Sequence, residues 1–222
     1  MKNINSSQLE VKSRRLTRAE RAEFVLSAEL KDILVGLFLG DLYGQKKTIN
    51  SNVHLQFVQG LVNKDYLQHL YELFKNYCTA APKISDMLPD KRTGKAYSRI
   101  RFNTYSLPCF NELYDSFYPE GKKIIPSNIF DLITPLGIAY WICDDGYFDK
   151  RGRAVVIATQ GFSPEEVNLL GKILTDKFNL KCSINLSNGG FIVRISAKSL
   201  LVLQSLLSPV MPPMMRHKIG LS

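Results

Sequence analysis

Two adjacent carboxylates at the end of an apolar segment are the feature that most constrains this chain. Residues 134–148 read TPLGIAYWICDDGYF, so an apolar helix reaches Asp144 and Asp145 and is then followed by Gly146. The C-terminus of a helix carries about half an elementary negative charge, so acids placed there are repelled unless a partner compensates their charge. A bound metal ion would compensate it.

A second segment ends in the same way. Residues 34–44 read LVGLFLGDLYG and are apolar as far as Leu39, after which the chain reaches Gly40 and Asp41. The apolar positions have helical spacing, so we expect a helix that ends near Asp41. Gly36 and Gly40 would lie on one face of this helix. Because an interior helical glycine costs about 1 kcal/mol, the pair predicts close packing against another backbone.

Composition favours an intracellular protein with a polyanionic partner. The 222 residues carry a net charge of +9 and are 45% hydrophobic, enough for one large core or two small ones. A basic chain favours nucleic acid over a membrane as the partner, and the sequence has no long uncharged apolar run for a transmembrane helix. The cysteines form no C-x-x-C pair, so neither a zinc site nor a disulfide framework is predicted.

Residues 1–28 are expected to form a basic N-terminal arm. They lack the apolar core of a secretory signal, and acids such as Glu10 and Glu20 are unusual in an organellar transit segment. We therefore expect an arm that touches phosphate, with a solvated tail over residues 1–10 as the simpler alternative. The basic residues of this arm are Lys2, Lys12, Arg14, Arg15, Arg18 and Arg21.

Hydrophobic periodicity predicts two similar halves. Residues 29–118 read as helix, strand pair, helix, strand pair and helix, and residues 134–222 repeat that order. Between them, residues 119–133 contain prolines, a glycine and two lysines, and they are interpreted as a linker.

Matching residues in the two halves predict an internal duplication. Asp41 and Asp145 are 104 positions apart, and the dipeptides that begin at Gln59 and Gln160 are 101 positions apart. The stretch RFNTYSL, from Arg101, also aligns with RISAKSL, from Arg194. Such spacing across a whole half is the signature of a repeated unit.

These motifs resemble those of a known family. LVGLFLGDL and IAYWICDDG resemble the signature of the LAGLIDADG homing endonucleases, and the segments around KKIIP and PPMMRHK resemble its two-repeat monomeric branch, encoded in mitochondrial introns. The similarity covers about residues 29–218. It implies an α+β (mixed α/β) fold of two pseudo-symmetric αββαββα repeats. Their signature helices would pack together, and two saddle-shaped antiparallel sheets would enter the DNA major groove.

The resemblance implies a metal-dependent nuclease. If the signature helices lie side by side, their terminal acids converge and can hold Mg²⁺ through oxygen ligands. Asp41 and Asp145 are the predicted ligands, with Gly40 and Asp144 as further candidates. We expect Mn²⁺ to replace Mg²⁺ and Ca²⁺ to bind without cleavage. Metals activate the attacking water and stabilise the leaving oxygen, which would give a staggered double-strand cut with short 3′ overhangs that initiates intron mobility.

Asp144 departs from a simple repeat. It aligns with Gly40, while Tyr140 aligns with Gly36, so the glycines of the first helix are interpreted as notches for the bulkier second helix. Asp144 is then an interface residue or, alternatively, the metal ligand. A plain helix end capped by Gly146 explains the glycine but not two acids at the negative pole.

Polar and cationic residues are expected around the metal. By the family pattern, Gln59 and Gln160 would orient water, and Lys123 and Lys218 would stabilise phosphate charge, with Lys122 as the competitor of Lys123. DNA-contact candidates follow from strand placement, since arginine can read guanine or hold phosphate. They are Lys46, Lys47, Arg99, Arg101, Arg153, Lys181 and Arg194.

The predicted function is site-specific cleavage of double-stranded DNA by a monomer. One alternative is an intron RNA maturase, because members of the family also assist splicing, and such a protein would not need Asp41 or Asp145. The other is a non-catalytic DNA-binding protein of the same fold, for which an acid or lysine should be lost. The resemblance also implies a mitochondrion or another organelle as the compartment.

Overall fold

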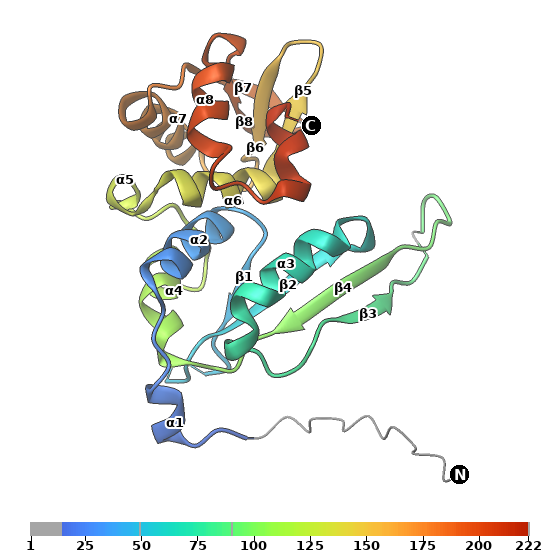
Figure 1. Ribbon diagram of the computed structural model, residues 1–222, viewed down its shortest axis with the longest axis vertical. Coiled ribbons are helices and arrows are strands. Elements are labelled where there is room, and N and C mark those ends of the chain that lie inside the picture. The colour runs from blue at the N-terminus through green and yellow to red at the C-terminus, as the bar shows by residue number, and fades with distance from the viewer. Residues whose placement is uncertain (1–14, 49, 90, 222) are drawn as a thin grey trace, which may run out of the picture.

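The computed structural model describes residues 15–48, 50–89 and 91–221. Within these residues the chain forms two four-stranded antiparallel sheets, in the orders β1-β2-β4-β3 and β5-β6-β8-β7, with helices packed against them (Figure 1). This arrangement confirms the predicted mixed α/β fold with two repeats. Of the predicted arm, Lys2, Lys12 and Arg14 lie outside the described residues.

The first half has the predicted order of helices and strands, with short 3₁₀ segments at several helix ends. Its elements are α1 (Arg18–Ala22), α2 (Ala28–Leu39), β1 (Tyr43–Gln45), β2 (His54–Gly60), η1 (Leu61–Asn63), α3 (Lys64–Phe74), η2 (Lys75–Tyr77), β3 (Lys83–Asp86), β4 (Ser98–Asn103), η3 (Pro108–Phe110) and α4 (Asn111–Phe117).

The second half repeats this order and adds a 3₁₀ segment at the end. Its elements are α5 (Ile129–Leu132), α6 (Pro135–Asp145), β5 (Gly146–Asp149), β6 (Ala154–Ala158), α7 (Pro164–Phe178), β7 (Cys182–Ser187), β8 (Gly190–Ile195), η4 (Ala197–Ser199), α8 (Leu200–Leu207) and η5 (Pro213–Ile219). In the described part of the chain, every helix is too short or too polar to cross a membrane.

Local sequence signals account for the helix ends. Thr134 caps α6 by accepting a hydrogen bond from the N–H of Gly137, and Pro135 fills the first helical position. Ser163 and Glu166 form a capping box at the start of α7. Helix α2 ends at Leu39, slightly earlier than expected, because the backbone leaves the helical conformation at the next residue.

The first sheet buries one face and leaves the other open along β4. In β4, Ile100 and Phe102 are buried while Arg101 is exposed, as the alternation predicts. Phe102 stacks on Phe57 of β2 with ring centroids 4.4 Å apart. The arginine-bearing face of the first sheet is therefore the face turned away from the core.

Helices α2 and α6 pack backbone to backbone at the centre of the molecule (Figure 1). A Cβ added to Gly36 would lie 2.0 Å from the carbonyl oxygen of Gly137, so no side chain fits there. The expectation that bulky residues of the second helix fill both notches is therefore wrong for Gly36, which meets another glycine. At Gly40 it is confirmed, because a Cβ there would lie 2.6 Å from the side chain of Asp144.

The segment between the halves is packed against the second half. It contains the short helix α5, and Ile125 donates its N–H to Glu166 Oε1 at 2.7 Å. Lys177 of α7 donates to the carbonyl oxygens of Phe130 and Ile133 at 2.5 and 3.0 Å. This segment is thus held in place, which matters because Lys123 lies in it.

Candidate active site

The paired helices bring three carboxylates together. Helix α6 ends at Asp145, and Asp41 lies two residues beyond the end of α2. Burial and then the charge of Asp41 raise the pKa of Asp145 to about 7, although nearby Lys123 and Lys218 lower it. A carboxyl group in water has a pKa near 4, so the acids share a site that lacks sufficient positive charge.

Asp144, on α6, connects this helix to the first half of the chain. Its Oδ2 accepts a hydrogen bond from the backbone N–H of Asp41 at 3.1 Å, and its Oδ1 accepts from Tyr66 Oη at 3.2 Å and Gln59 Nε2 at 3.4 Å. Burial first, and then the charge of Asp41, raise the pKa of Asp144 to about 8. Its carboxyl group is thus occupied by three donors from the other repeat.

Two lysines lie at equivalent positions beside the acids. Lys123 Nζ donates to the carbonyl oxygen of Gly40 at 2.5 Å, and Lys218 Nζ donates to that of Asp144 at 3.1 Å and also to that of Cys143. Burial lowers the pKa of both ammonium groups, and the three carboxylates oppose this by raising it. Each helix end therefore has its own cation.

Lys122 and Lys123 have different surroundings. The side chain of Lys122 is exposed, whereas that of Lys123 is partly buried and reaches the end of α2. The geometry favours Lys123 as the functional lysine.

The two glutamines do not occupy equivalent positions. Gln59, the last residue but one of β2, contacts Asp144 and accepts a hydrogen bond from Asn63 Nδ2 at 3.0 Å. Tyr43 pairs with Gln56, and its counterpart Tyr147 pairs with Val156, so the strand register makes Thr159 the counterpart of Gln59.

The sequence alignment of Gln160 with Gln59 was therefore wrong. Thr159 is buried, and its Oγ1 donates to the carbonyl oxygen of Phe191 at 2.7 Å. Gln160 follows with an exposed side chain, which packs on Gly190. The reason is chain length, since the first hairpin of the second half is shorter than that of the first.

The donor set fits a hard divalent cation in part. Carboxylate and carbonyl oxygens are the ligands that Mg²⁺ prefers, and Mg²⁺ in proteins usually takes one or two carboxylates together with substrate phosphate and water. Among the described residues, no three His, Cys, Asp or Glu side chains are grouped to hold a metal by themselves. The carbonyl oxygen of Gly40 also accepts from Lys123 already. A metal here would need oxygens from a substrate.

A hollow of about 580 Å³ opens beside these groups along the first sheet. Its lining includes Asp41, Gln59, Tyr97 and Arg99, together with the exposed Val62. A substrate lying in this hollow would contact both a catalytic candidate and the arginine-bearing face.

Four predicted DNA-contact residues are exposed to solvent, and a fifth is partly buried. Arg99 and Arg101 lie on the open face of β4, where Arg99 also contacts Ser85 Oγ at 3.4 Å. The four exposed candidates are Lys47, Arg101, Arg153 and Lys181, and none of them forms an ion pair with another described residue.

The two remaining candidates form ion pairs within the protein. Lys46 donates to Asp115 Oδ1 at 2.5 Å, and Arg194 donates to Asp149 Oδ2 at 2.7 Å. Each would have to leave or share its carboxylate in order to contact DNA.

Sequence reasoning missed Tyr66 and Asn63. Tyr66 lies on α3, where its spacing predicts a core residue, and it is indeed buried. Its hydroxyl group nevertheless reaches Asp144, and Asn63 holds Gln59. No local pattern distinguishes a buried tyrosine whose hydroxyl group faces an acid.

Comparisons with known proteins agree with this geometry. The model of the LAGLIDADG DNA endonuclease family matches residues 31–203. A cytochrome b mRNA maturase bI2 of Saccharomyces cerevisiae is 33% identical over 207 residues, which cover 88% of this chain and 48% of that protein. A probable intron-encoded endonuclease 1 of Wickerhamomyces canadensis is 33% identical over 200 residues, with coverage of 87% and 85%. The chain spans about half the length of the maturase.

A solved structure shares the fold over nearly the whole chain. The homing endonuclease I-WcaI, bound to its DNA recognition sequence, superposes with a TM-score of 0.85 at 30% sequence identity. The match covers 92% of each chain.

Proposed function

Because this chain belongs to the LAGLIDADG DNA endonuclease family, we propose that it is a site-specific endonuclease that cuts both strands of a long DNA target. The observation that carries the proposal is the pair of helix ends, each with one acid and one lysine. Lys123 donates to the backbone at the end of α2, just before Asp41, and Lys218 donates to the backbone at the end of α6, just before Asp145; both lysines interact electrostatically with both acids. Two such centres in one chain suit cleavage of two strands by a monomer.

Each group at the site has a distinct task in phosphodiester hydrolysis. Asp41 and Asp145 would hold a divalent metal, which, when bound, supplies a Lewis acid for the attacking water and the leaving oxygen. Lys123 and Lys218 stabilise the charge that develops on the phosphate. Gln59 orients water in the first half, and Asp144 fixes both Gln59 and the backbone of Asp41.

Mg²⁺ is the proposed cation. The donors are all oxygens, and a small number of carboxylates completed by phosphate is typical of magnesium. Mn²⁺ should support cleavage because it also accepts oxygen ligands, and Ca²⁺ should bind without supporting it. The raised pKa of Asp145 is consistent with a site that is stabilised when a cation binds.

Double-stranded DNA is the proposed substrate. The open face of β4 offers Arg99 and Arg101, and I-WcaI, which shares the fold, was solved with its DNA recognition sequence. A mitochondrion is the proposed compartment, because the relatives include a cytochrome b mRNA maturase and a protein named as intron-encoded.

The test is cleavage of a complex DNA library by the purified protein with Mg²⁺, followed by sequencing of the new ends. A recurrent site with short 3′ overhangs is expected. Asp41→Asn and Asp145→Asn should each lower the cleavage rate at least about a hundredfold and leave DNA affinity within about threefold, because the amide keeps the shape and loses the charge. Asp131→Asn, an exposed acid on α5, is the matched control. Normal cutting by Asp145→Asn would refute the assignment.

An intron RNA maturase is the second candidate, supported by the yeast relative. Splicing does not require the metal-binding carboxylates, so Asp41→Asn should leave RNA affinity and splicing unchanged. If the wild-type protein cuts no DNA but promotes splicing of a structured intron RNA, the maturase becomes the primary function.

A further inference from the structure

A network of hydrogen bonds, here called the Asp144 network, connects four parts of the chain near the acids. Tyr66 Oη donates to Asp144 Oδ1 at 3.2 Å, and Gln59 Nε2 donates to the same oxygen at 3.4 Å. Asp144 Oδ2 accepts from the backbone N–H of Asp41 at 3.1 Å. Gln59 Oε1 accepts from Asn63 Nδ2 at 3.0 Å. The network therefore links α6 to β2, to the start of α3 and to the loop that follows α2.

Tyr66 belongs both to the core and to this network. Its side chain is 1% exposed, and its ring centroid lies 6.5 Å from that of Tyr140 on α6. A buried hydroxyl group is costly to leave without a partner, and here its partner is Asp144 Oδ1. Replacement by phenylalanine would keep the ring and remove only the hydroxyl group. The hydrogen bond can thus be tested apart from the packing of the ring.

The hydroxyl group of Tyr66 fixes the direction of the Asp144 carboxyl group. The torsion that rotates a carboxyl group is broad, so its direction depends on its hydrogen bonds. The other donor to Oδ1 is Gln59, at the long distance of 3.4 Å. Loss of the hydroxyl group would leave this oxygen with the longer of these two hydrogen bonds. Gln59 and the N–H of Asp41 would then be held less firmly.

The network depends on the glycine that precedes Asp41. A Cβ added to Gly40 would lie 2.6 Å from both Cβ and Oδ2 of Asp144, so a larger residue would displace the acid. Gly40 and Asp144 each stand directly before the acid at their own helix end. One repeat thus supplies the space, and the other supplies the carboxyl group.

The second half cannot form the same arrangement. Because the equivalent of Asp144 in the first half is Gly40, the first half has no side chain there to reach the second. The equivalent of Gln59 is Thr159, whose hydroxyl group donates to a backbone carbonyl group of β8. The network therefore supports the end of α2 alone. This end, here called the first centre, has Asp41, Gln59 and the ammonium group of Lys123.

We propose that Tyr66 is a positioning residue for the first centre. Through Asp144 it fixes the direction of Gln59 and the backbone at Asp41, and it thereby sets the rate at which one DNA strand is cut. The inference rests on the proposed endonuclease function. Tyr66 is buried and acts only through the carboxyl group of Asp144.

The test compares Tyr66→Phe with the wild-type protein on the target recovered from the library. Protein in excess over a duplex with strand-specific end labels gives the rate of cutting of each strand in Mg²⁺, and affinity for DNA is measured separately in Ca²⁺. The matched control is Tyr77→Phe in the same half. It removes a hydroxyl group that donates to the carbonyl oxygen of Val25 at 2.7 Å.

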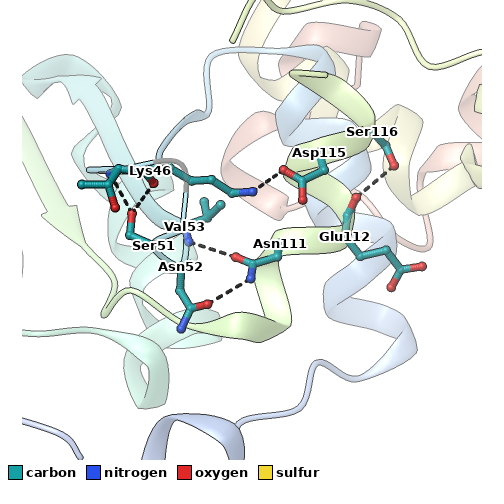
Figure 2. A network of polar contacts seen from close by, with 9 residues as sticks. Lys46, Ser51, Asn52, Val53, Asn111, Glu112, Asp115 and Ser116 are labelled. Atoms are coloured by element: carbon teal, nitrogen blue, oxygen red, sulfur yellow. Dashed lines mark hydrogen bonds and ion pairs between the residues drawn. The ribbon is translucent and has the colours of Figure 1, made fainter. Parts of the chain in front are cut away.

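A second control weakens the first half at a different polar network (Figure 2). Asn111 Nδ2, on α4, donates to Asn52 Oδ1 at 3.0 Å, and Asn111 Oδ1 accepts from the N–H of Val53, also at 3.0 Å. Asn111→Ala removes both hydrogen bonds. Its thermal unfolding and its cutting rates together show what a loss of stability in this half does to each strand.

Tyr66→Phe should slow the cutting of one strand on the order of 10- to 100-fold, the usual effect of removing a partner of a metal-site group. This should be the strand that Lys123→Met also slows, because both residues act on the first centre. The other strand should be cut at the wild-type rate, and affinity for DNA should not change. A supercoiled plasmid should therefore accumulate as a nicked circle. Both controls should cut the two strands in the wild-type ratio.

The metal-free protein without DNA provides a readout that does not depend on cleavage. In NMR spectra, the backbone amide resonance of Asp41 and the side-chain amide resonances of Gln59 report their hydrogen bonds to Asp144. Tyr66→Phe should shift the resonances of both residues, because the carboxyl group turns. Tyr77→Phe should shift neither.

Other outcomes would overturn the proposal. Equal slowing of both strands, or a strand bias that Asn111→Ala reproduces, would mean that Tyr66 acts through stability alone. Wild-type cutting of both strands by Tyr66→Phe, or unchanged amide resonances, would mean that the hydroxyl group positions nothing. If the wild-type protein cuts no DNA, the endonuclease function itself is refuted, and the amide resonances still show whether Tyr66 holds the network.

Discussion

Asp144 and Asp145 are neighbours in sequence but have opposite surroundings. Asp144 is held by donors from Asp41, Gln59 and Tyr66, all in the first half. Burial and then repulsion by Asp41 raise the pKa of Asp145, and they outweigh the lowering effect of Lys123 and Lys218. One acid thus joins the two halves, and the other is left for a cation.

Asp145→Asn should stabilise the metal-free protein at high pH. The pKa of Asp145 is raised to about 7 in the folded state, so below that pH the folded protein holds a proton that the unfolded chain loses near pH 4. The stability contributed by this proton is therefore present at low pH and is lost as pH rises towards 7. Above pH 7 the buried charge carries its full cost, which the neutral amide avoids.

Thermal unfolding of the wild-type protein and of Asp145→Asn, in EDTA at pH 8 and pH 4.5, tests this predicted stabilisation. The variant should unfold at a higher temperature than the wild-type protein at pH 8, by about 2–4 °C for each kcal/mol gained. The difference should nearly vanish at pH 4.5, where the folded wild-type carboxyl is already neutral. A gain that is equal at both pH values would mean that charge is not the cause. Asp131→Asn should have no effect at either pH.

At the residue scale, the sequence predicted those site residues that occur in both halves. Asp41, Asp145, Lys123 and Lys218 were predicted, and the structure brings them together. The sequence did not predict a role for Tyr66, because its hydrogen bond to Asp144 depends on how α3 packs against α2 and α6.

At the scale of elements, the packing of α2 on α6 determines where the acids lie. Gly36 and Gly137 allow the two backbones to touch, and this crossing sets the position of both C-termini. Alanine has about 1 kcal/mol better helix propensity than glycine. If Gly36→Ala lowers the stability of the protein, the cause must therefore be the contact between α2 and α6, because the change in helix propensity alone would raise it.

Gly36→Ala should strongly destabilise the protein and abolish cleavage. Its Cβ would lie 2.0 Å from the backbone of Gly137, which cannot move as a flexible side chain can. A cost of about 3 kcal/mol or more is expected, which corresponds to a fall of about 6–12 °C in Tm. Differential scanning calorimetry and the cleavage assay measure the two effects. Gly161→Ala, whose Cβ would meet nothing within 4 Å, is the control, and an equal effect there would contradict the argument.

The elements that sequence reasoning identified are those with strong periodicity and clear caps. The end of α6 at the two acids was predicted, because the apolar segment stops there and Gly146 follows. The 3₁₀ segment η5, which carries Lys218, was not predicted, because its prolines and methionines have no helical period. Helix α5 was missed for a similar reason, since prolines around it indicate a linker.

At the scale of the whole molecule, the two centres are similar but differently supported. Lys123 comes from the segment between the halves, whereas Lys218 comes from the last 3₁₀ segment of the described chain. The first centre has Gln59 near its acid, and the strand register places a buried threonine at the equivalent position of the second. The two repeats therefore surround the two helix ends with unequal groups.

This asymmetry predicts that each lysine serves one DNA strand. The ammonium group of Lys123 reaches the end of α2 and that of Lys218 reaches the end of α6, so Lys123→Met should slow cutting of one strand and Lys218→Met that of the other. Loss of one cation at developing phosphate charge should cost about 10²–10³ in rate on the affected strand. A supercoiled plasmid would then accumulate as a nicked circle, and strand-specific end labels would identify the uncut strand. Lys122→Met should cut both strands normally. If either lysine variant slows both strands equally, the two centres share one rate-limiting step and are not separable by strand.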